Sequence, residues 1–223
     1  MRYSRFALYF TCPPGALADA GSAWLGWDIA QGQSVPHPAT PKEAARLTER
    51  PRKYGFHATL KPPFRLAPGA NKEGLHDMLR SFAAQQAPMT LPALTVRQIG
   101  RFVALVPAAP SPALQDLAAA CVTHFESCRA PLTEDDLARR RAGTLSARQE
   151  ELLVTYGYPY VLDEFRFHMT LTGPLDEPEP VAAALQTHFA PVVPEPFVID
   201  AVSLCGERDD GRFDAIDRVP LTG

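Results

Sequence analysis

Two histidines in this sequence are each followed, two residues later, by a threonine. Residues 57–60 read His-Ala-Thr-Leu and residues 168–171 read His-Met-Thr-Leu, and a phenylalanine precedes each copy. An imidazole titrates near neutral pH, so one histidine can act as a neutral base while the other acts as a charged acid. A threonine hydroxyl can donate a hydrogen bond to an oxygen that gains charge during a reaction. Hydrolysis of a phosphodiester needs such a set, because one group takes a proton from water and another gives one to the leaving oxygen.

The two motifs belong to an internal repeat. The second histidine follows the first by 111 residues, and the same offset relates Gly100-Arg101-Phe102 to Gly211-Arg212-Phe213. A shared offset over two distant blocks indicates a duplicated unit. In a strand, residues i and i+2 point to the same face, so each histidine shares a face with its threonine. We therefore predict one site with two catalytic histidines and two phosphate-binding threonines: His57, His168, Thr59 and Thr170.

The elements that must position these motifs follow the same order in both halves. A strand is predicted over residues 54–60, ended by Pro62-Pro63, and its counterpart is predicted over residues 164–172. Each is followed by a helix and then by a hairpin. The helices are expected at about 72–86 and 180–188, and the hairpins at about 91–107 and 197–216. A short helix is also expected to open at Pro41-Lys42 and run through Leu47.

This order predicts an α/β (α+β) fold with two pseudo-symmetric lobes. Each lobe is expected to hold an antiparallel sheet flanked by helices, with a central cleft between the lobes. Residues 1–223 would form a single bilobal domain, with repeats at approximately 1–107 and 108–223.

One segment breaks the symmetry of the repeat. The second half carries about 15 extra residues, which we place in a helical insert at about 131–160. A helix start signal stands at Thr133, and arginines are dense at 139–141. We expect the arginines to form a solvated helix face. The insert ends in an aromatic loop just before the second histidine strand, so we expect it to form a flap that selects the substrate.

Bulk composition excludes several classes of protein. The net charge is −3 and the pI is about 6.1, so no global basic field exists to hold long nucleic acid, although a local basic patch could meet a small anion. The four cysteines show no C-x-x-C spacing, which argues against a zinc knuckle or a redox pair. We find neither an export signal nor an apolar run of about 18 residues. A cytoplasmic, monomeric protein is expected.

The longer strings around the motifs resemble a known superfamily. They read Arg-Lys-Tyr-Gly-Phe-His-Ala-Thr-Leu-Lys-Pro-Pro-Phe over residues 52–64 and Glu-Phe-Arg-Phe-His-Met-Thr-Leu-Thr-Gly over residues 164–173. Paired His-x-Thr motifs in a duplicated chain resemble the two-histidine (2H) phosphoesterases, and these strings resemble a branch associated with phosphonate metabolism. The resemblance covers essentially the whole chain. It implies hydrolysis of a cyclic or small phosphodiester, such as a ribose or nucleoside cyclic phosphate, without a metal or another cofactor.

Five further residues are weaker candidates for binding the substrate. On strand alternation Lys61 shares the face of His57, and Arg166 shares the face of His168, so either could hold a phosphate or be an exposed edge charge. Tyr158 and Tyr160 could stack on a base or sugar or could only pack in a turn. Tyr54, just before the first motif, is the fifth candidate.

Other readings of the motifs stay open. The histidines could be structural, or the chain could be a non-catalytic module that binds a nucleotide or an RNA end. A metallohydrolase is disfavoured because no H-x-x-x-H or H-x-E ligand set accompanies the histidines. The sequence does not distinguish the natural substrate, nor which histidine is the base.

Overall fold

A mixed set of strands and helices makes up the structure, a computed structural model that describes residues 3–39 and 43–223. The strands are β1 (Phe6–Thr11), β2 (Trp27–Asp28), β3 (Gln33–Ser34), β4 (His57–Phe64), β5 (Met89–Leu91), β6 (Leu94–Ile99), β7 (Phe102–Pro107), β8 (Met169–Thr170), β9 (Phe197–Ile199), β10 (Ala201–Glu207) and β11 (Phe213–Pro220). The helices are α1 (Ala16–Leu25), α2 (Ala44–Leu47), α3 (Lys72–Ala83), α4 (Pro112–His124), α5 (Glu134–Arg140), α6 (Ala147–Tyr156) and α7 (Pro178–Phe189), with short 3-10 turns η1 (Pro51–Tyr54), η2 (Glu126–Cys128) and η3 (Leu162–Glu164). The predicted start of α2 at Pro41-Lys42 lies outside the described residues.

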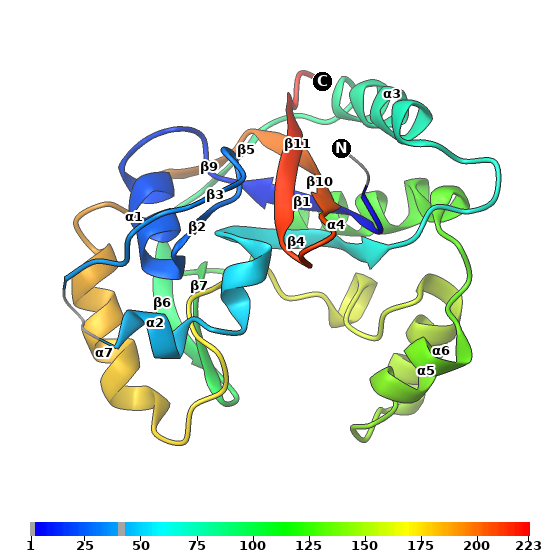
Figure 1. Ribbon diagram of the computed structural model, residues 1–223. Coiled ribbons are helices and arrows are strands. Elements are labelled where there is room, and N and C mark those ends of the chain that lie inside the picture. The colour runs from blue at the N-terminus through cyan, green and yellow to red at the C-terminus, as the bar shows by residue number, and fades with distance from the viewer. Residues whose placement is uncertain (1–2, 40–42) are drawn as a thin grey trace.

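A seven-stranded sheet dominates the fold, with helices around it (Figure 1). The strand order is β11-β10-β1-β4-β8-β7-β6, and every neighbouring pair is antiparallel. The predicted α+β class, with antiparallel sheet and flanking helices, is confirmed. The two sheets expected for the two lobes are joined into one, because β4 pairs with β8 through Ala58 and Met169.

Strands from both halves of the sequence are mixed in this sheet. From the first half, β7 pairs with β8 and β6 lies beyond β7; from the second half, β10 pairs with β1 and β11 lies beyond β10. Each end of the sheet is therefore built by both halves of the chain. The repeat limits at residues 107 and 108 stay a prediction.

The first histidine strand starts and ends later than predicted. Proline residues 62 and 63 were expected to end it, but β4 runs on to Phe64, and it begins at His57 because Tyr54 belongs to η1. The pairing of β4 with β1 shifts register on both sides of Leu8, whose partner is Lys61. Such β-bulges interrupt the regular ladder of backbone hydrogen bonds. Proline has no backbone N–H to donate to this ladder, so it is tolerated there.

The second histidine strand is shorter than predicted. Of residues 164–172, only Met169–Thr170 form a strand. The chain then leaves the ladder, because the N–H groups of both Leu171 and Thr172 donate to the carbonyl of Val103, and Gly173 donates to Leu47. The alternation of the sequence was correct at the motif itself, but tertiary hydrogen bonds decide where the strand stops.

One apolar core lies on the face of the sheet opposite to the site. Ala58, Leu60 and Met169 belong to it, and so do the inner faces of α3, α4 and α7. The helices α3 and α7 start and end within three residues of their predicted limits. Within the described residues, we find no helix that is both long and apolar enough to cross a membrane.

The insert forms the predicted helical pair, α5 and α6 (Figure 1). Thr133 caps α5 and accepts from the N–H of Asp136, whose carboxylate accepts from the Thr133 N–H in return. An ion pair between Arg141 and Glu150 ties the two helices together.

Candidate active site

The pairing of β4 with β8 brings the two His-x-Thr motifs side by side. Ala58 is opposite Met169, and both are fully buried in the core. In an antiparallel pair this register sets His57 opposite Thr170 and Thr59 opposite His168. Because side chains alternate along a strand, all four point away from the core, toward the same face of the sheet. The predicted convergence of the four residues is therefore present in the structure, while their catalytic roles stay a prediction.

Backbone carbonyls orient both imidazole rings. Nδ1 of His57 is 3.0 Å from the carbonyl oxygen of Gly55, and Nδ1 of His168 is 2.7 Å from that of Arg166. A carbonyl oxygen only accepts, so each Nδ1 carries the hydrogen and each neutral ring keeps its lone pair on Nε2. Nε2 of His57 lies 3.2 Å from the hydroxyl oxygen of Thr59, which donates to it. Both rings thus carry the lone pair that could accept a proton on Nε2, and on His57 this lone pair accepts the Thr59 hydroxyl hydrogen in the structure without ligand.

The surroundings of His57 favour its neutral form. Its ring stacks on buried Tyr9, with 3.8 Å between ring centroids and 26° between planes. Burial lowers the pKa of His57 to about 4, and the nearby His168 adds to this effect. Burial also lowers the pKa of His168. The effect of His168 on the pKa of His57 agrees with the placement of the two rings on the paired strands β4 and β8.

A cavity of about 250 Å³ adjoins the motifs. His57, Thr170 and Tyr54 line it, as do Arg50 and Phe102. The ring of Phe102 is 5.7 Å from that of His168, and the ring of Tyr54 is 6.2 Å from that of His57. The cavity is of a size for a small ligand. Sequence reasoning missed Arg50 and Phe102, since no local pattern marks them; only the fold brings them beside the motifs.

The prediction that Lys61 shares the face of His57 is wrong. The bulge in β4 sets Lys61 opposite Leu8, whose side chain lies in the main core. The lysine therefore points to the helix-covered face, where Nζ donates to the carbonyl of Val122 at 2.8 Å and to Glu126 at 3.0 Å. One extra residue in a strand reverses the alternation beyond it, and this accounts for the error.

The other weaker candidates occupy different places. Arg166 contributes the carbonyl that orients His168, and its side chain is exposed. Tyr158 is half-buried beneath Arg140, whose guanidinium carbon is 4.9 Å from the ring centroid. Burial raises the pKa of Tyr158, and the cation of Arg140 opposes this rise. Tyr160 packs edge-on against Tyr158 but is 49% exposed. Of these candidates only Tyr54 lines the cavity, whereas Tyr158 packs under Arg140 and Tyr160 lies at the surface.

The part of the chain that the structure describes contains no cluster of metal-binding side chains. Across residues 3–39 and 43–223, no three or more histidine, cysteine, aspartate or glutamate side chains are grouped so that they could hold a metal ion. The four cysteines are free thiols, with Cys12 partly exposed and the others buried.

Comparison with known proteins identifies a family and two named relatives. The family model described as "Protein of unknown function (DUF1045)" matches residues 59–214. Two curated relatives are named ribose 1,5-bisphosphate phosphokinase PhnN. The one from Janthinobacterium sp. (strain Marseille) is 42% identical over 232 residues, which is 99% of this chain and 51% of the relative. The one from Laribacter hongkongensis (strain HLHK9) is 38% identical over 176 residues, covering 78% of this chain and 41% of the relative. This chain spans about half the length of the curated relatives it matches.

Similar solved structures include phosphoesterases. E. coli LigT in its apo form is 16% identical, with full coverage of both chains and a TM-score of 0.47. A crystal structure described as a phosphoesterase is 19% identical, with full coverage of both chains and a TM-score of 0.46. The match to the family model spans more than half of the chain and includes Thr59, His168 and Thr170, and this protein therefore belongs to the DUF1045 family.

Proposed function

We propose that this chain hydrolyses a small cyclic phosphodiester, with His57 and His168 as general base and general acid. The observation that carries the proposal is the register of β4 and β8, which sets each histidine opposite the threonine of the other motif beside a cavity of about 250 Å³. One phosphate group can then meet two imidazoles and two hydroxyls.

The proposed reaction needs only these four side chains and water. Nε2 of His57 takes a proton from a water molecule while the water oxygen bonds to phosphorus. The bond from phosphorus to one ring oxygen breaks, and protonated His168 gives the Nε2 proton to that oxygen. The hydroxyls of Thr59 and Thr170 donate to the non-bridging oxygens, where negative charge builds up. The product is a phosphomonoester beside a free hydroxyl, and proton exchange with solvent restores both histidines.

His57 is the stronger candidate for the base. A base must be neutral before reaction, and the pKa of His57, lowered to about 4 by burial, keeps it neutral at pH 7. His168 must carry a proton, and an anionic phosphate bound beside it would raise its pKa by favouring the charged ring.

The names of the curated relatives support a ribose cyclic phosphate as the substrate. Both are named as kinases of ribose 1,5-bisphosphate, and this chain matches about half of their length. A phosphate that bridges oxygens 1 and 2 of ribose 5-phosphate would become ribose 1,5-bisphosphate when its bond to oxygen 2 is hydrolysed. Such a reaction would supply the compound in the relatives' name and would fit a place in phosphonate metabolism.

A screen of cyclic phosphates in the presence of excess EDTA tests the proposal. Ribose and nucleoside cyclic phosphates are incubated with the protein, and phosphorus NMR assigns which ring oxygen leaves. We expect turnover that survives the chelator and falls by about 10²–10⁴-fold in His57→Ala and in His168→Ala, the loss typical of a missing general acid or base.

The control is His124→Ala, an exposed histidine outside both motifs, which should keep full activity. Tight binding of a cyclic phosphate without turnover would instead indicate the non-catalytic binding module. Activity that EDTA abolishes would contradict the metal-free chemistry.

A further inference from the structure

The three consecutive arginines at the end of α5 do not share one environment. Arg139 is exposed and pairs with Asp136, and Arg141 pairs with Glu150. Arg140 turns inward, is half-buried and lies over the ring of Tyr158 at 4.9 Å. Within residues 3–39 and 43–223, no carboxylate forms an ion pair with Arg140. The solvated face predicted for this cluster is thus correct for two arginines and wrong for the third, because successive helix positions are about 100° apart.

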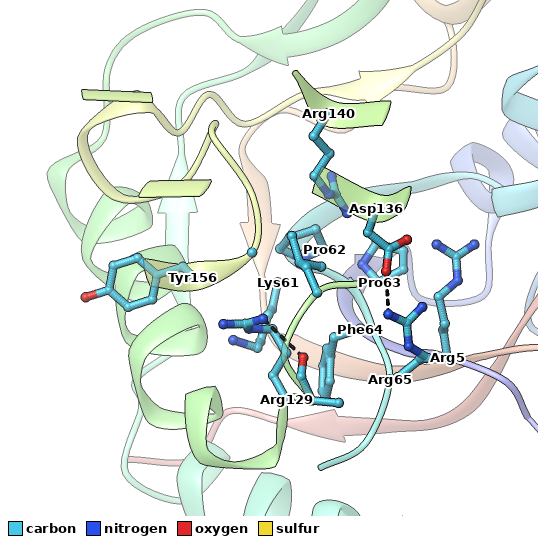
Figure 2. A pocket seen from close by; sticks show the side chains of 13 residues that line it. Arg5, Lys61, Pro62, Pro63, Phe64, Arg65, Arg129, Asp136, Arg140 and Tyr156 are labelled. Carbon is cyan, nitrogen blue, oxygen red and sulfur yellow. Dashed lines mark hydrogen bonds and ion pairs between the residues drawn. The ribbon is translucent and has the colours of Figure 1, made fainter. Parts of the chain in front are cut away.

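Arg140 lines a small pocket together with four other cationic side chains. We call it the basic pocket, and Figure 2 shows Arg140 extending from α5 toward Pro62, next to the Asp136–Arg65 pair. Its cations are Arg5, Lys61, Arg65, Arg129 and Arg140.

The carboxylates around the basic pocket do not balance its positive charge. Glu207 pairs with Arg5, Asp136 pairs with Arg65, and Glu126 pairs with both Lys61 and Arg129. Five cations against three carboxylates leave an excess of two positive charges, in a chain whose net charge is −3.

The excess charge is partly shielded from water at Arg140. Burial lowers the pKa of Arg140. Tyr158 and the carboxylate of Asp136 oppose this shift, whereas the cationic side chains of Arg5 and Arg139 add to it, and Asp136 already pairs with Arg65 and Arg139. A guanidinium that loses hydration and gains no carboxylate is destabilised unless an anion from outside the chain completes its surroundings.

The basic pocket and the active site share strand β4. Its lining includes residues 61–65, which follow Thr59 closely along the chain. A strand advances about 3.3 Å per residue, so this lining begins about 7 Å from Thr59. A second group on a ligand held at the His-x-Thr motifs would have the basic pocket within reach along β4.

We infer that the basic pocket binds a second phosphate group of the substrate, so that the substrate is a cyclic phosphodiester that also carries a phosphomonoester. This inference rests on the proposed function, which gives a binding site to the cyclic phosphate but none to a second phosphate. A planar guanidinium binds two phosphate oxygens at once, and Arg140 is the side chain free to do so. The enclosed space of the pocket is about 20 Å³, room for about one water molecule, so a phosphate group would meet Arg140 at the mouth of the pocket.

Calorimetric titration with ribose 5-phosphate tests the pocket without any turnover. We expect binding to the wild type and about 10- to 100-fold weaker binding to Arg140→Ala, the range for losing a charged hydrogen-bonding group. Arg139→Ala is the matched control, because it removes the neighbouring exposed arginine of the same helix and should bind like the wild type. Equal affinity of Arg140→Ala and the wild type, or equal weakening by both substitutions, overturns the inference.

Kinetics with paired substrates then links the pocket to the reaction. Ribose 1,2-cyclic phosphate is compared with and without a 5-phosphate, and kcat/KM should be at least about 10-fold higher with it in the wild type. Arg140→Ala should remove this preference while hydrolysis of the substrate without the 5-phosphate persists. A preference unchanged in Arg140→Ala overturns the inference. If the wild type hydrolyses neither compound, the proposed function fails, and the calorimetric comparison still decides what the pocket binds.

Discussion

Tyr9 lies beneath the ring of His57 at a centroid distance of 3.8 Å and helps to bury it. Replacing Tyr9 with Leu removes the stacked ring and admits water, so we expect the pKa of His57 to rise from about 4 toward its ordinary value of 6.5. Tyr9→Phe keeps the ring and should leave the pKa unchanged. Imidazole NMR titration measures both, and a value near 4 in Tyr9→Leu would show that other groups set it.

The two lowered histidine pKa values also fix the expected pH dependence of kcat/KM. The base, His57, is neutral above its pKa of about 4, so activity should fall below that pH. The acid, His168, is charged only below its own pKa, which burial lowers from 6.5, so activity should fall again as pH rises through that value. The profile should be a bell with its maximum on the acidic side of pH 6.5. His168→Asn should remove the alkaline limb, and a profile that rises steadily to pH 8 would contradict the assignment.

At the scale of elements, Lys61 and Glu126 hold η2 and the end of α4 against β4. The lysine side chain is only 2% exposed, and Glu126 also pairs with Arg129. Glu126→Gln leaves two cations without their carboxylate, and we expect a loss of about 3 kcal/mol in the free energy of unfolding, the lower end for breaking a buried pair. Glu150→Gln is the control, because it breaks the exposed pair with Arg141 and should cost less than about 1 kcal/mol. Urea titration of both variants decides the comparison.

The helical pair α5–α6 and its aromatic loop remain our candidate for substrate selection. Tyr158 is half-buried beneath Arg140, whereas Tyr160 is 49% exposed. We expect Tyr158→Ala to reduce kcat/KM for a substrate with a 5-phosphate far more than for a minimal cyclic phosphate. Tyr160→Ala should change neither. If Tyr158→Ala reduces both substrates equally while staying folded, the loop only supports the structure.

The sequence predicted elements and motifs well where the signal is local. The two His-x-Thr units face one side because alternation over three residues survives in both short strands, and caps such as Thr133 mark true helix starts. Lys61 was misplaced because a bulge at its neighbour depends on pairing with β1, which lies far away in the sequence. Arg140 was misplaced because the rotation of α5 against the rest of the molecule is a tertiary property, and no pattern within the helix encodes it.

At the scale of the whole molecule, the candidate active site lies where the two ends of the sheet meet. Within residues 3–39 and 43–223 these ends are joined by the pairing of β4 with β8, and the catalytic candidates lie on or beside those two strands. The proposed chemistry would therefore take place at the joint between the halves of the sheet, beside the core residues Ala58 and Met169.

The exchange of strands between the two halves of the sequence has a consequence for how the protein loses its structure. Neither half of the chain can complete an end of the sheet alone, since β6 and β7 depend on β8, and β10 depends on β1. We expect a single cooperative transition in urea, with enzymatic activity and helical circular dichroism disappearing at the same concentration. Two fragments produced by cleaving the exposed connection near Pro110 should each be unfolded alone and should regain activity only when mixed. The two halves of the chain would then be partners in one folding unit and not separable domains.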